Sequence, residues 1–207
     1  MYICIIDNQL GNIYSVCNAL KNLKVDFKVS RKKNIIKKSD GIIFPGVGSF
    51  PAAIDNLRKF QIYDLILKEL EKKKPFLGIC LGMQILMSFS EEIKKTKGLN
   101  FINGEVRKFP EKKNLKLPHV GWNKINKTKN NFLLKGIDEN ASFYFDHSYY
   151  VSIGNQKTIT SKSNYGINFV SSCYKDNVCG VQFHPEKSQL NGNIILQNFF
   201  NFVRNKA

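Results

Sequence analysis

Cys80 stands in a pattern that could make it a nucleophile. The apolar residues 75–79 predict a strand and residues 81–89 a helix, with Cys80 at their junction between Gly78 and Gly82. In such a sharp turn, the residues two positions before and after the nucleophile crowd the strand and the helix, and glycine relieves that crowding. The thiol would lie at a helix N-terminus, where free N–H groups favour a thiolate and stabilise an oxyanion. A buried structural cysteine is the alternative interpretation.

A thiol nucleophile generally needs a base that is held by a third group. One of the three histidines, His184, ends the predicted strand 178–183 and is followed by Pro185 and Glu186. In extended chain, residues two apart point the same way, and proline limits the backbone between them. We therefore expect Glu186 to orient the imidazole of His184, at the sheet edge where Cys80 also lies. An exposed turn without a catalytic role is the alternative.

A glycine-rich turn follows another apolar segment. Residues 41–44 predict a strand, and residues 45–48, Pro-Gly-Val-Gly, come directly after it. If this turn lies at the same sheet edge, its N–H groups and that of Leu81 could surround a tetrahedral intermediate. A plain tight turn or a phosphate loop is the competing interpretation. A P-loop is excluded because no Gly-Lys-Ser/Thr follows.

The net charge of +16 raises the question of nucleic-acid binding. Only four of the 32 basic residues are arginine, and the others are lysine. Surfaces that recognise bases or clamp phosphates favour arginine for its bidentate fork. We therefore expect a solvated lysine surface and no nucleic-acid partner. A basic binding module is the non-enzymatic alternative, and its nucleic-acid affinity would be salt-sensitive and indifferent to Cys80→Ala.

Cysteine usage and apolar runs indicate the compartment. The chain has five cysteines, no C-x-x-C pair and no basic leader after Met1, which argues against a disulfide framework or a zinc site. The longest apolar runs, such as residues 2–6 and 41–44, are too short to span a bilayer. We expect a reduced cytoplasmic protein with no metal, no cofactor and no membrane partner.

The order of predicted elements indicates an α/β fold. Strands and helices alternate in the first half, which predicts a mostly parallel central sheet flanked by helices. After about residue 98 the pattern changes to shorter β-like runs, which predict an antiparallel extension. With no linker or repeat, we expect one domain over residues 1–207. The expected strands are 2–6, 25–29, 41–44, 75–79, 104–109, 142–144, 157–160, 169–174 and 178–183, and the expected helices include 81–89, one or two over 54–70, and 193–203.

Together these segments resemble the class I glutamine amidotransferases, and more narrowly the glutaminase subunits of imidazole glycerol phosphate synthases. The resemblance covers nearly the whole chain. It is carried by Ile6-Asp7 with Gly11-Asn12 and Ser15-Val16, Pro45-Gly46-Val47-Gly48-Ser49-Phe50, residues 78–84, and residues 180–188 with the sequence GVQFHPEKS. Two further segments narrow the family: residues 117–123 (LPHVGWN) and residues 143–149 (FYFDHSY).

The resemblance implies a role for each matching residue. Cys80 would attack the glutamine side-chain amide to form a thioester, His184 would give a proton to the departing ammonia and then activate water, and Glu186 would orient His184. The positions implied in glutamine binding and around the oxyanion are Gly46, Val47, Gly48, Leu81, Gln84, Glu92, Ser148 and Tyr149. Glu92 also fits ordinary surface charge at a helix end.

The resemblance also implies a partner. In the family the glutaminase forms a heterodimer with a (β/α)8-barrel cyclase, which receives the ammonia and makes imidazole glycerol phosphate and an aminoimidazole carboxamide ribotide. His119, Trp122 and Asn123 would belong to the docking face, with a core tryptophan and a capped turn as the alternative.

Departures from the family pattern leave a second partner open. Asn8 and Gln9 stand where many relatives carry tyrosine and a small residue, and Asp146 stands where valine is common. They could mark a paralogue that supplies ammonia to a sugar- or nucleotide-modifying synthase. A peptidase or isomerase with the same nucleophile turn is disfavoured by the spacing of His184 and Glu186 and by Gln84.

Overall fold

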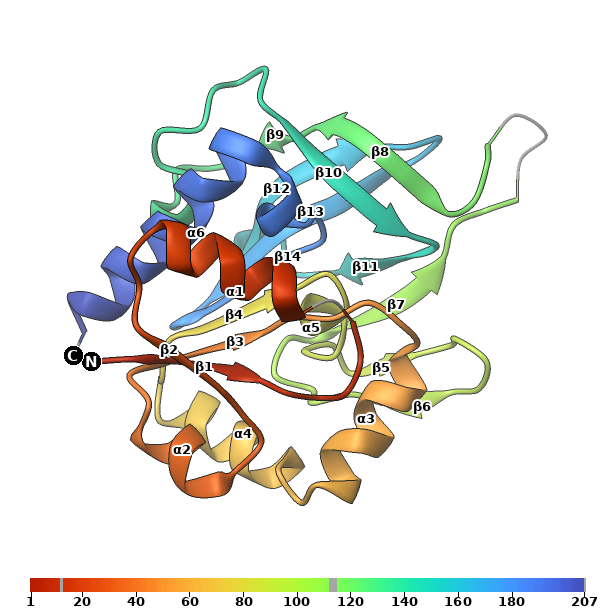
Figure 1. The fold of residues 1–207 in the computed structure, drawn as a ribbon. Helices are drawn as coiled ribbons and strands as arrows, with labels where there is room; N and C mark the ends of the chain where they lie inside the picture. Colours follow the sequence, from red (N-terminus) through yellow and green to blue (C-terminus); the bar gives the residue numbers. More distant parts are fainter. Residues whose placement is uncertain (12, 112–114, 207) are drawn as a thin grey trace.

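The computed structural model describes residues 1–11, 13–111 and 115–206, and one sheet of eight strands runs through it (Figure 1). Five neighbouring strands are parallel, and three antiparallel strands extend the sheet on one side. Asn12, named in the resemblance, lies outside the described residues. The order is β2 (Phe27–Ser30), β1 (Ile3–Ile6), β3 (Gly41–Phe44), β4 (Phe76–Ile79), β14 (Val178–Val181), β13 (Asn168–Lys175), β12 (Ile159–Asn164) and β9 (Asn126–Lys127).

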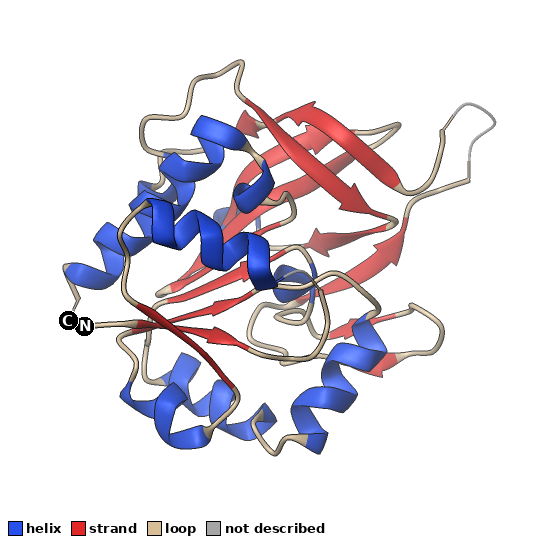
Figure 2. Ribbon diagram, viewed as in Figure 1, coloured by secondary structure: helices blue, strands red, loops and turns tan. Residues whose placement is uncertain are grey.

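Helices cover both faces of the parallel strands, as Figure 2 shows. Successive strand residues point to opposite faces, so Ile5 packs with one helix layer while Cys4 and Ile6 pack with the other. This confirms the predicted α/β class with a mostly parallel sheet and an antiparallel extension. One layer holds α1 (Ile13–Asn22) and α6 (Gln189–Arg204), and the other holds α2 (Lys33–Lys38), α3 (Phe50–Lys59) and α4 (Tyr63–Glu71).

The register of the central strands gathers their carboxyl ends at one edge. Val181 of β14 pairs with Ile79 of β4, and Phe44 of β3 pairs with Gly78 of β4. The chain leaves these strands at the Pro45 turn, at Cys80 and at Gln182, so the three segments emerge side by side. Ligands bind at this edge in open α/β sheets.

Two smaller sheets stand beside this edge. A four-stranded sheet has the order β11 (Tyr149–Ile153), β7 (Gly104–Lys108), β5 (Phe89–Ser90) and β6 (Thr96–Lys97), and β10 (Ser142–His147) pairs with β8 (His119–Lys124). Strand β10 is attached to the end of β14 because His184 N donates to Tyr144 O at 2.8 Å and Tyr144 N donates to Ser188 Oγ at 3.0 Å. Short 3-10 turns complete the described elements: η1 (Phe132–Leu134), η2 (Gln156–Thr158) and η3 (Pro185–Lys187).

The predicted helix over residues 81–89 is wrong in its length. Helix α5 (Leu81–Gln84) ends after one turn, and residue 89 already belongs to β5. The carbonyls of Ile85 and Met87 accept instead from Leu99 N at 2.8 Å and Asn100 N at 3.0 Å. Tertiary bonds to a distant segment therefore replace the helical ladder. The predicted final helix begins four residues early, at Gln189, and α2 was not among the predicted helices.

Within the described part of the chain, no helix is long and apolar enough to cross a membrane. The five cysteines are free and buried. No group of three or more His, Cys, Asp or Glu side chains that could hold a metal ion is found among residues 1–11, 13–111 and 115–206.

Candidate active site

Cys80 occupies a strained turn between β4 and α5. Its φ of 52° and ψ of −103° are rare for any residue but glycine. A Cβ on Gly78 would lie 2.3 Å from Gly82 O, and one on Gly82 would lie 1.9 Å from Phe44 O. Both distances are far below contact distance, which confirms the steric reason for glycine at both positions.

The sulfur of Cys80 is held from two sides. The Cys80 backbone N donates to Val181 O at 2.7 Å, which fixes the turn against β14. The thiol donates toward Asp146 O at 3.9 Å, and Gln182 Nε2 donates to the sulfur at 3.5 Å. Cys80 is only 5% exposed, and the exposed part faces a cavity.

His184 and Glu186 form a buried pair. His184 Nδ1 lies 2.8 Å from Glu186 Oε1, and the two side chains are 1% and 5% exposed. The pairing was predicted from an extended chain, but Glu186 lies in the 3-10 turn η3, which brings its carboxylate back under the imidazole. Ser188 Oγ donates to His184 O at 2.6 Å and keeps the turn closed.

The charge around His184 sets its protonation. Burial lowers the pKa of His184, but the negative charges on Cys80 and Glu186 raise it more, to about 10. A protonated His184 imidazole is therefore favoured at neutral pH. His184 Nε2 is buried and has no partner of hydrogen-bond geometry among the described residues, and interaction with the Cys80 side chain is the main cause that raises the pKa of His184.

A cavity of about 240 Å³ opens beside the sulfur. This volume lies below the roughly 300–1,000 Å³ of sites for drug-sized ligands, so it suits a molecule of amino-acid size. Cys80 and seven of the eight residues predicted to bind glutamine line the cavity, namely Val47, Gly48, Leu81, Gln84, Glu92, Ser148 and Tyr149. The remaining one, Gly46, lies against the Leu81 side chain.

Gln84 and Glu92 are held by the backbone around the cavity. Gln84 Nε2 donates to Tyr149 O at 3.0 Å, and the residue is 5% exposed. Glu92 Oε2 accepts from Phe50 N, the first residue of α3, at 2.7 Å. Burial raises the pKa of Glu92, while this backbone bond lowers it. Glu92 is therefore an ordered carboxyl group at the cavity and not freely solvated charge.

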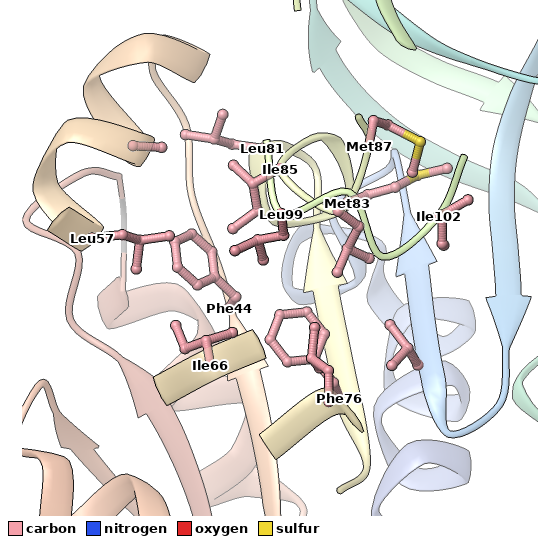
Figure 3. Close-up of a cluster of buried hydrophobic side chains, with 14 of the residues drawn as sticks. Phe44, Leu57, Ile66, Phe76, Leu81, Met83, Ile85, Met87, Leu99 and Ile102 are labelled. Atoms are coloured by element: carbon pink, nitrogen blue, oxygen red, sulfur yellow. The ribbon is translucent and has the colours of Figure 1, made fainter. Parts of the chain in front are cut away.

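The glycine-rich turn presents a carbonyl where donors were expected. Leu81 N donates to Gly46 O at 3.4 Å, so this N–H is already paired. The Leu81 side chain is anchored in the buried cluster drawn in Figure 3. Val47 N lies on the far side of the same peptide, where a Cβ on Gly11 would meet it at 2.5 Å. The expected ring of N–H groups around an oxyanion is therefore not assembled in this conformation.

The residues predicted to dock a partner fall on opposite sides of β8. Trp122 is 50% exposed and Val120 is 54% exposed, whereas His119 is 3% exposed. Asn123 points inward with His119, because Asn123 Nδ2 lies 3.2 Å from His119 Nε2. The alternation of a strand explains the separation. His119 lies behind the predicted docking face and not on it.

Several residues of the site escaped the sequence analysis. Pro118, Asp146 and His147 also line the cavity, and Gln182 contacts the sulfur from outside it. Gln182 follows directly on Val181, whose pairing with Ile79 sets it beside Cys80. The sequence did contain a signal, because Gln182 stands two residues before His184 and residues two apart in a strand point the same way. Only the register of β14 against β4 shows that this side faces Cys80.

A larger hollow of about 620 Å³ lies elsewhere, between α2 and α4. None of the described residues that line it is a cysteine or a histidine, and most are lysine, arginine or neutral side chains. Size alone therefore does not mark the reactive site. The smaller cavity holds the nucleophile candidate.

Comparisons with known proteins agree on one family. The family model for class-I glutamine amidotransferases matches residues 4–202. Imidazole glycerol phosphate synthase subunit HisH 1 of Campylobacter jejuni strain RM1221 is 41% identical over 198 residues, which cover 95% of this chain and 98% of that protein. The HisH subunit of Caldanaerobacter subterraneus is 45% identical over 201 residues, which cover 97% and 98%. A solved structure of a glutamine amidotransferase aligns with a TM-score of 0.76 over 99% of this chain and 100% of that one; at 17% identity this likeness concerns the fold alone.

Proposed function

Because the chain belongs to the class-I glutamine amidotransferases, we propose that it is the glutaminase subunit of an imidazole glycerol phosphate synthase in histidine biosynthesis. It hydrolyses glutamine to glutamate and ammonia, and the ammonia passes to a cyclase subunit. The observation that carries the proposal is that Cys80, in its strained turn, lines one cavity with Gln84, Glu92 and Tyr149. The full-length similarity to HisH subunits supports the synthase.

The first half-reaction uses the thiolate of Cys80. Its sulfur attacks the side-chain carbonyl carbon of glutamine, and the carbonyl oxygen takes the negative charge. His184 Nε2 then gives its proton to the amide nitrogen, the C–N bond breaks and ammonia leaves. Glu186 keeps the imidazole oriented and stabilises its positive charge, as the 2.8 Å contact with Nδ1 allows.

The second half-reaction regenerates the thiolate. Neutral His184 now takes a proton from water, and the resulting hydroxide adds to the thioester carbonyl. The C–S bond breaks, glutamate leaves, and the proton on His184 restores the starting charge pair with Cys80. One imidazole thus serves as acid and then as base, a role supported by an Nε2 that has no partner of hydrogen-bond geometry in the described part of the chain.

The turn at Gly46 provides the switch. Since Leu81 N is paired with Gly46 O, an oxyanion cannot be held until the peptide between Gly46 and Val47 turns over. That rotation removes the carbonyl and presents Val47 N–H beside Leu81 N–H, which gives two donors. Binding of the loaded partner favours the rotated state, so free enzyme wastes little glutamine.

The partner is a cyclase subunit with a (β/α)8 barrel, bound as a heterodimer. The exposed Val120 and Trp122 supply an apolar contact on β8, the strand that follows Pro118 at the cavity wall. The same proposal includes the predicted glutamine ligands and the docking face. It also includes a single domain over residues 1–207. The reactions on both subunits proceed in the cytoplasm.

The test is glutamine hydrolysis measured with and without the cyclase subunit of the histidine pathway and its nucleotide substrate. We expect a sharp rise on addition of both, complete loss in Cys80→Ala, and labelling of Cys80 by a glutamine-mimicking diazo compound. Stimulation by a sugar-modifying synthase alone would overturn the choice of partner. Failure to label Cys80 would overturn the glutaminase itself.

The switch has its own test in Gly48→Ala. Gly48 has a φ of +118°, a conformation that an alanine adopts only with strain, so the substitution restricts the turn. We expect partner-stimulated turnover to be lost while glutamine still binds. Unchanged stimulation would remove the switch from the mechanism and leave the glutaminase proposal intact.

A further inference from the structure

Gln182 joins a predicted glutamine-binding residue to the nucleophile. Its side chain is fully buried, its Nε2 donates to Cys80 Sγ at 3.5 Å, and its Oε1 accepts from Gln84 Nε2 at 3.3 Å. The backbone on either side is fixed, because Gln182 N donates to Ser171 O at 2.9 Å and Cys80 N donates to Val181 O at 2.7 Å. Both ends of the amide are therefore used, and the residue has little freedom to move.

The neighbours dictate which end of the amide faces the sulfur. Tyr149 O is a backbone carbonyl and can only accept, so the group of Gln84 that lies 3.0 Å from it must be the NH₂. The same NH₂ also faces the Gln182 side chain, so the Gln182 atom that accepts its hydrogen bond must be the oxygen, Oε1. The NH₂ of Gln182 is thus turned to Cys80. A flipped amide would place two donors face to face and an oxygen against the sulfur.

The two polar contacts of the sulfur favour different protonation states. Asp146 O, at 3.9 Å, can only accept and therefore favours the S–H form of Cys80. Gln182 Nε2, at 3.5 Å, can only donate and therefore favours the thiolate. An amide N–H does not titrate, so the contribution of Gln182 is present at every working pH, unlike that of His184.

Several titratable groups lie around the Cys80 sulfur beside the non-titrating N–H donor of Gln182. His184 supplies positive charge from the end of β14, with Glu186 behind it on η3. The other titratable side chains at the cavity are Asp146, His147, Tyr149 and Glu92. His147 carries no charge at neutral pH, because burial lowers its pKa to about 3.

We propose that Gln182 is a positioning residue of the glutaminase, holding the Cys80 sulfur and stabilising its thiolate through a side-chain N–H whose direction is fixed by Gln84 and Tyr149. The inference rests on the proposed role of Cys80 as nucleophile. It also links the two halves of the site. Gln84, which the family resemblance assigns to glutamine binding, shares one hydrogen-bonded chain with the reacting atom.

The experiment measures how fast iodoacetamide alkylates Cys80 as a function of pH, with the modified peptide identified by mass spectrometry. In Gln182→Glu the shape and the bond from Gln84 are kept, but the donor becomes a negative acceptor. We expect the midpoint of alkylation to rise by about 2 pH units, because a like charge disfavours the thiolate. In Gln182→Met the donor is simply lost, and we expect a rise of about 1 pH unit, a tenfold slower reaction below the midpoint.

A kinetic split separates positioning from general damage. Gln182→Glu keeps Gln84 in place, so we expect kcat for glutamine to fall at neutral pH and to recover at higher pH, with KM unchanged. Ser161→Ala is the matched control, since Ser161 is fully buried and bonded to two hydroxyl groups on the neighbouring strand. It should leave the alkylation midpoint where it is.

A measurement on the unaltered protein covers the case that the variants do not fold. The ¹⁵N and ¹H signals of the Gln182 side-chain amide should shift with pH at the midpoint of Cys80 alkylation, and those of the Gln197 side chain should not. Variants with an unchanged midpoint, or a Gln182 amide that ignores the titration, overturn the inference. Diazo labelling of Cys80 in the same samples shows separately whether the glutaminase proposal still stands.

Discussion

Two buried groups of histidines in this protein hold opposite charge states. His184 is 1% exposed and has its pKa raised to about 10, against the effect of burial, by the negative charges on Cys80 and Glu186. His147 and His119 are 6% and 3% exposed, and burial lowers their pKa values to about 3 and about 4. The depth of burial is similar, so it does not decide the charge.

The Nδ1 atoms of His184 and His147 are anchored almost identically. His184 Nδ1 lies 2.8 Å from Glu186 Oε1, and His147 Nδ1 lies 2.7 Å from Tyr149 O. The first acceptor is a carboxylate and the second is a neutral carbonyl. The negative charges beside the ring, first that on Cys80 and then that on Glu186, therefore separate an imidazole that can act as an acid from one that stays neutral, while the Nδ1 bond is alike in both.

The opposite nitrogens complete the contrast. The pKa of His184 is raised by the negative charge on Cys80, while its Nε2 has no partner of hydrogen-bond geometry among the described residues. His147 donates from Nδ1, so its neutral ring accepts at Nε2 from His119 Nδ1, at 3.0 Å, and His119 Nε2 then accepts from Asn123 Nδ2. One carbonyl fixes both tautomers along this chain. Neutral histidines serve here as scaffolding between β8, β10 and the cavity.

The largest effect should come from removing the charged imidazole. In His184→Asn no group can transfer a proton to the leaving ammonia, and we expect partner-stimulated kcat to fall by on the order of 10³-fold or more. Steady-state release of glutamate measures it. A His147→Phe variant that loses as much kcat would contradict the assignment of the acid and base to His184.

Changing only the charge of the acceptor tests the contrast more directly. Glu186→Gln keeps a side-chain oxygen for His184 Nδ1 but removes the negative charge, so the pKa of His184 should fall. We expect kcat to drop by roughly 10–100-fold, within the range of a single acid–base contribution, with glutamine still bound. The measurement is kcat and KM across pH. Full activity in this variant would mean that geometry alone suffices.

The neutral pair of His147 and His119 should make the folding stability sensitive to acid. A buried His147 with a lowered pKa binds fewer protons when folded than when unfolded, so its contribution to stability is lost as pH falls from about 6.5 toward 3. His184 has the opposite sign, and its contribution is present below about 6.5 and is lost as pH rises toward 10.

His147→Phe removes one of these acid-sensitive groups. We expect the protein to be less stable at pH 7.5 by about 2 kcal/mol, because His119 Nδ1 loses its acceptor. Its free energy of unfolding should nevertheless fall less steeply toward pH 4.5 than that of the unaltered protein. Urea unfolding at several pH values compares the two slopes. Parallel slopes would show that other groups, such as Glu69, whose pKa is lowered despite burial by its ion pairs with Lys74 and Lys72, dominate acid unfolding.

The sequence predicted the short local motifs of the site better than the contacts between segments that are far apart in the chain. The spacing of Gly78, Cys80 and Gly82 expresses a local steric demand, so the turn could be inferred without any partner strand. The pairing of His184 with Glu186 was also inferred, although through an extended chain that proved to be a 3-10 turn. The roles of these residues in catalysis stay predictions.

Contacts that depend on the register of strand pairing could not be predicted from the sequence. The helix after Cys80 was predicted too long because the donors that end it, Leu99 and Asn100, come from another part of the chain. Gln182 meets the sulfur only because β14 pairs with β4 in one register, where a shift of one residue would reverse its side. His119 was placed on the docking face because the alternation along β8 depends on where that strand pairs with β10.

The smallest expected effect is a rise in the pKa of the neutral His119, toward the behaviour of His184. Asn123→Asp places a carboxylate where the amide now lies 3.2 Å from His119 Nε2. A protonated His119 would donate from Nε2 to the new carboxylate and from Nδ1 to His147 Nε2, so the bonds between these three side chains are kept, whereas the bond from Asn123 Nδ2 to Asn164 O is lost. We expect the pKa of His119 to rise from about 4 by about one unit, the lower end of the effect of a nearby opposite charge. The pH dependence of the His119 ring signals in NMR measures the shift, with Lys124→Ala on the same strand as the control. A pKa that stays in place despite the carboxylate would mean that burial outweighs the charge of the partner, and that the contrast with His184 has another cause.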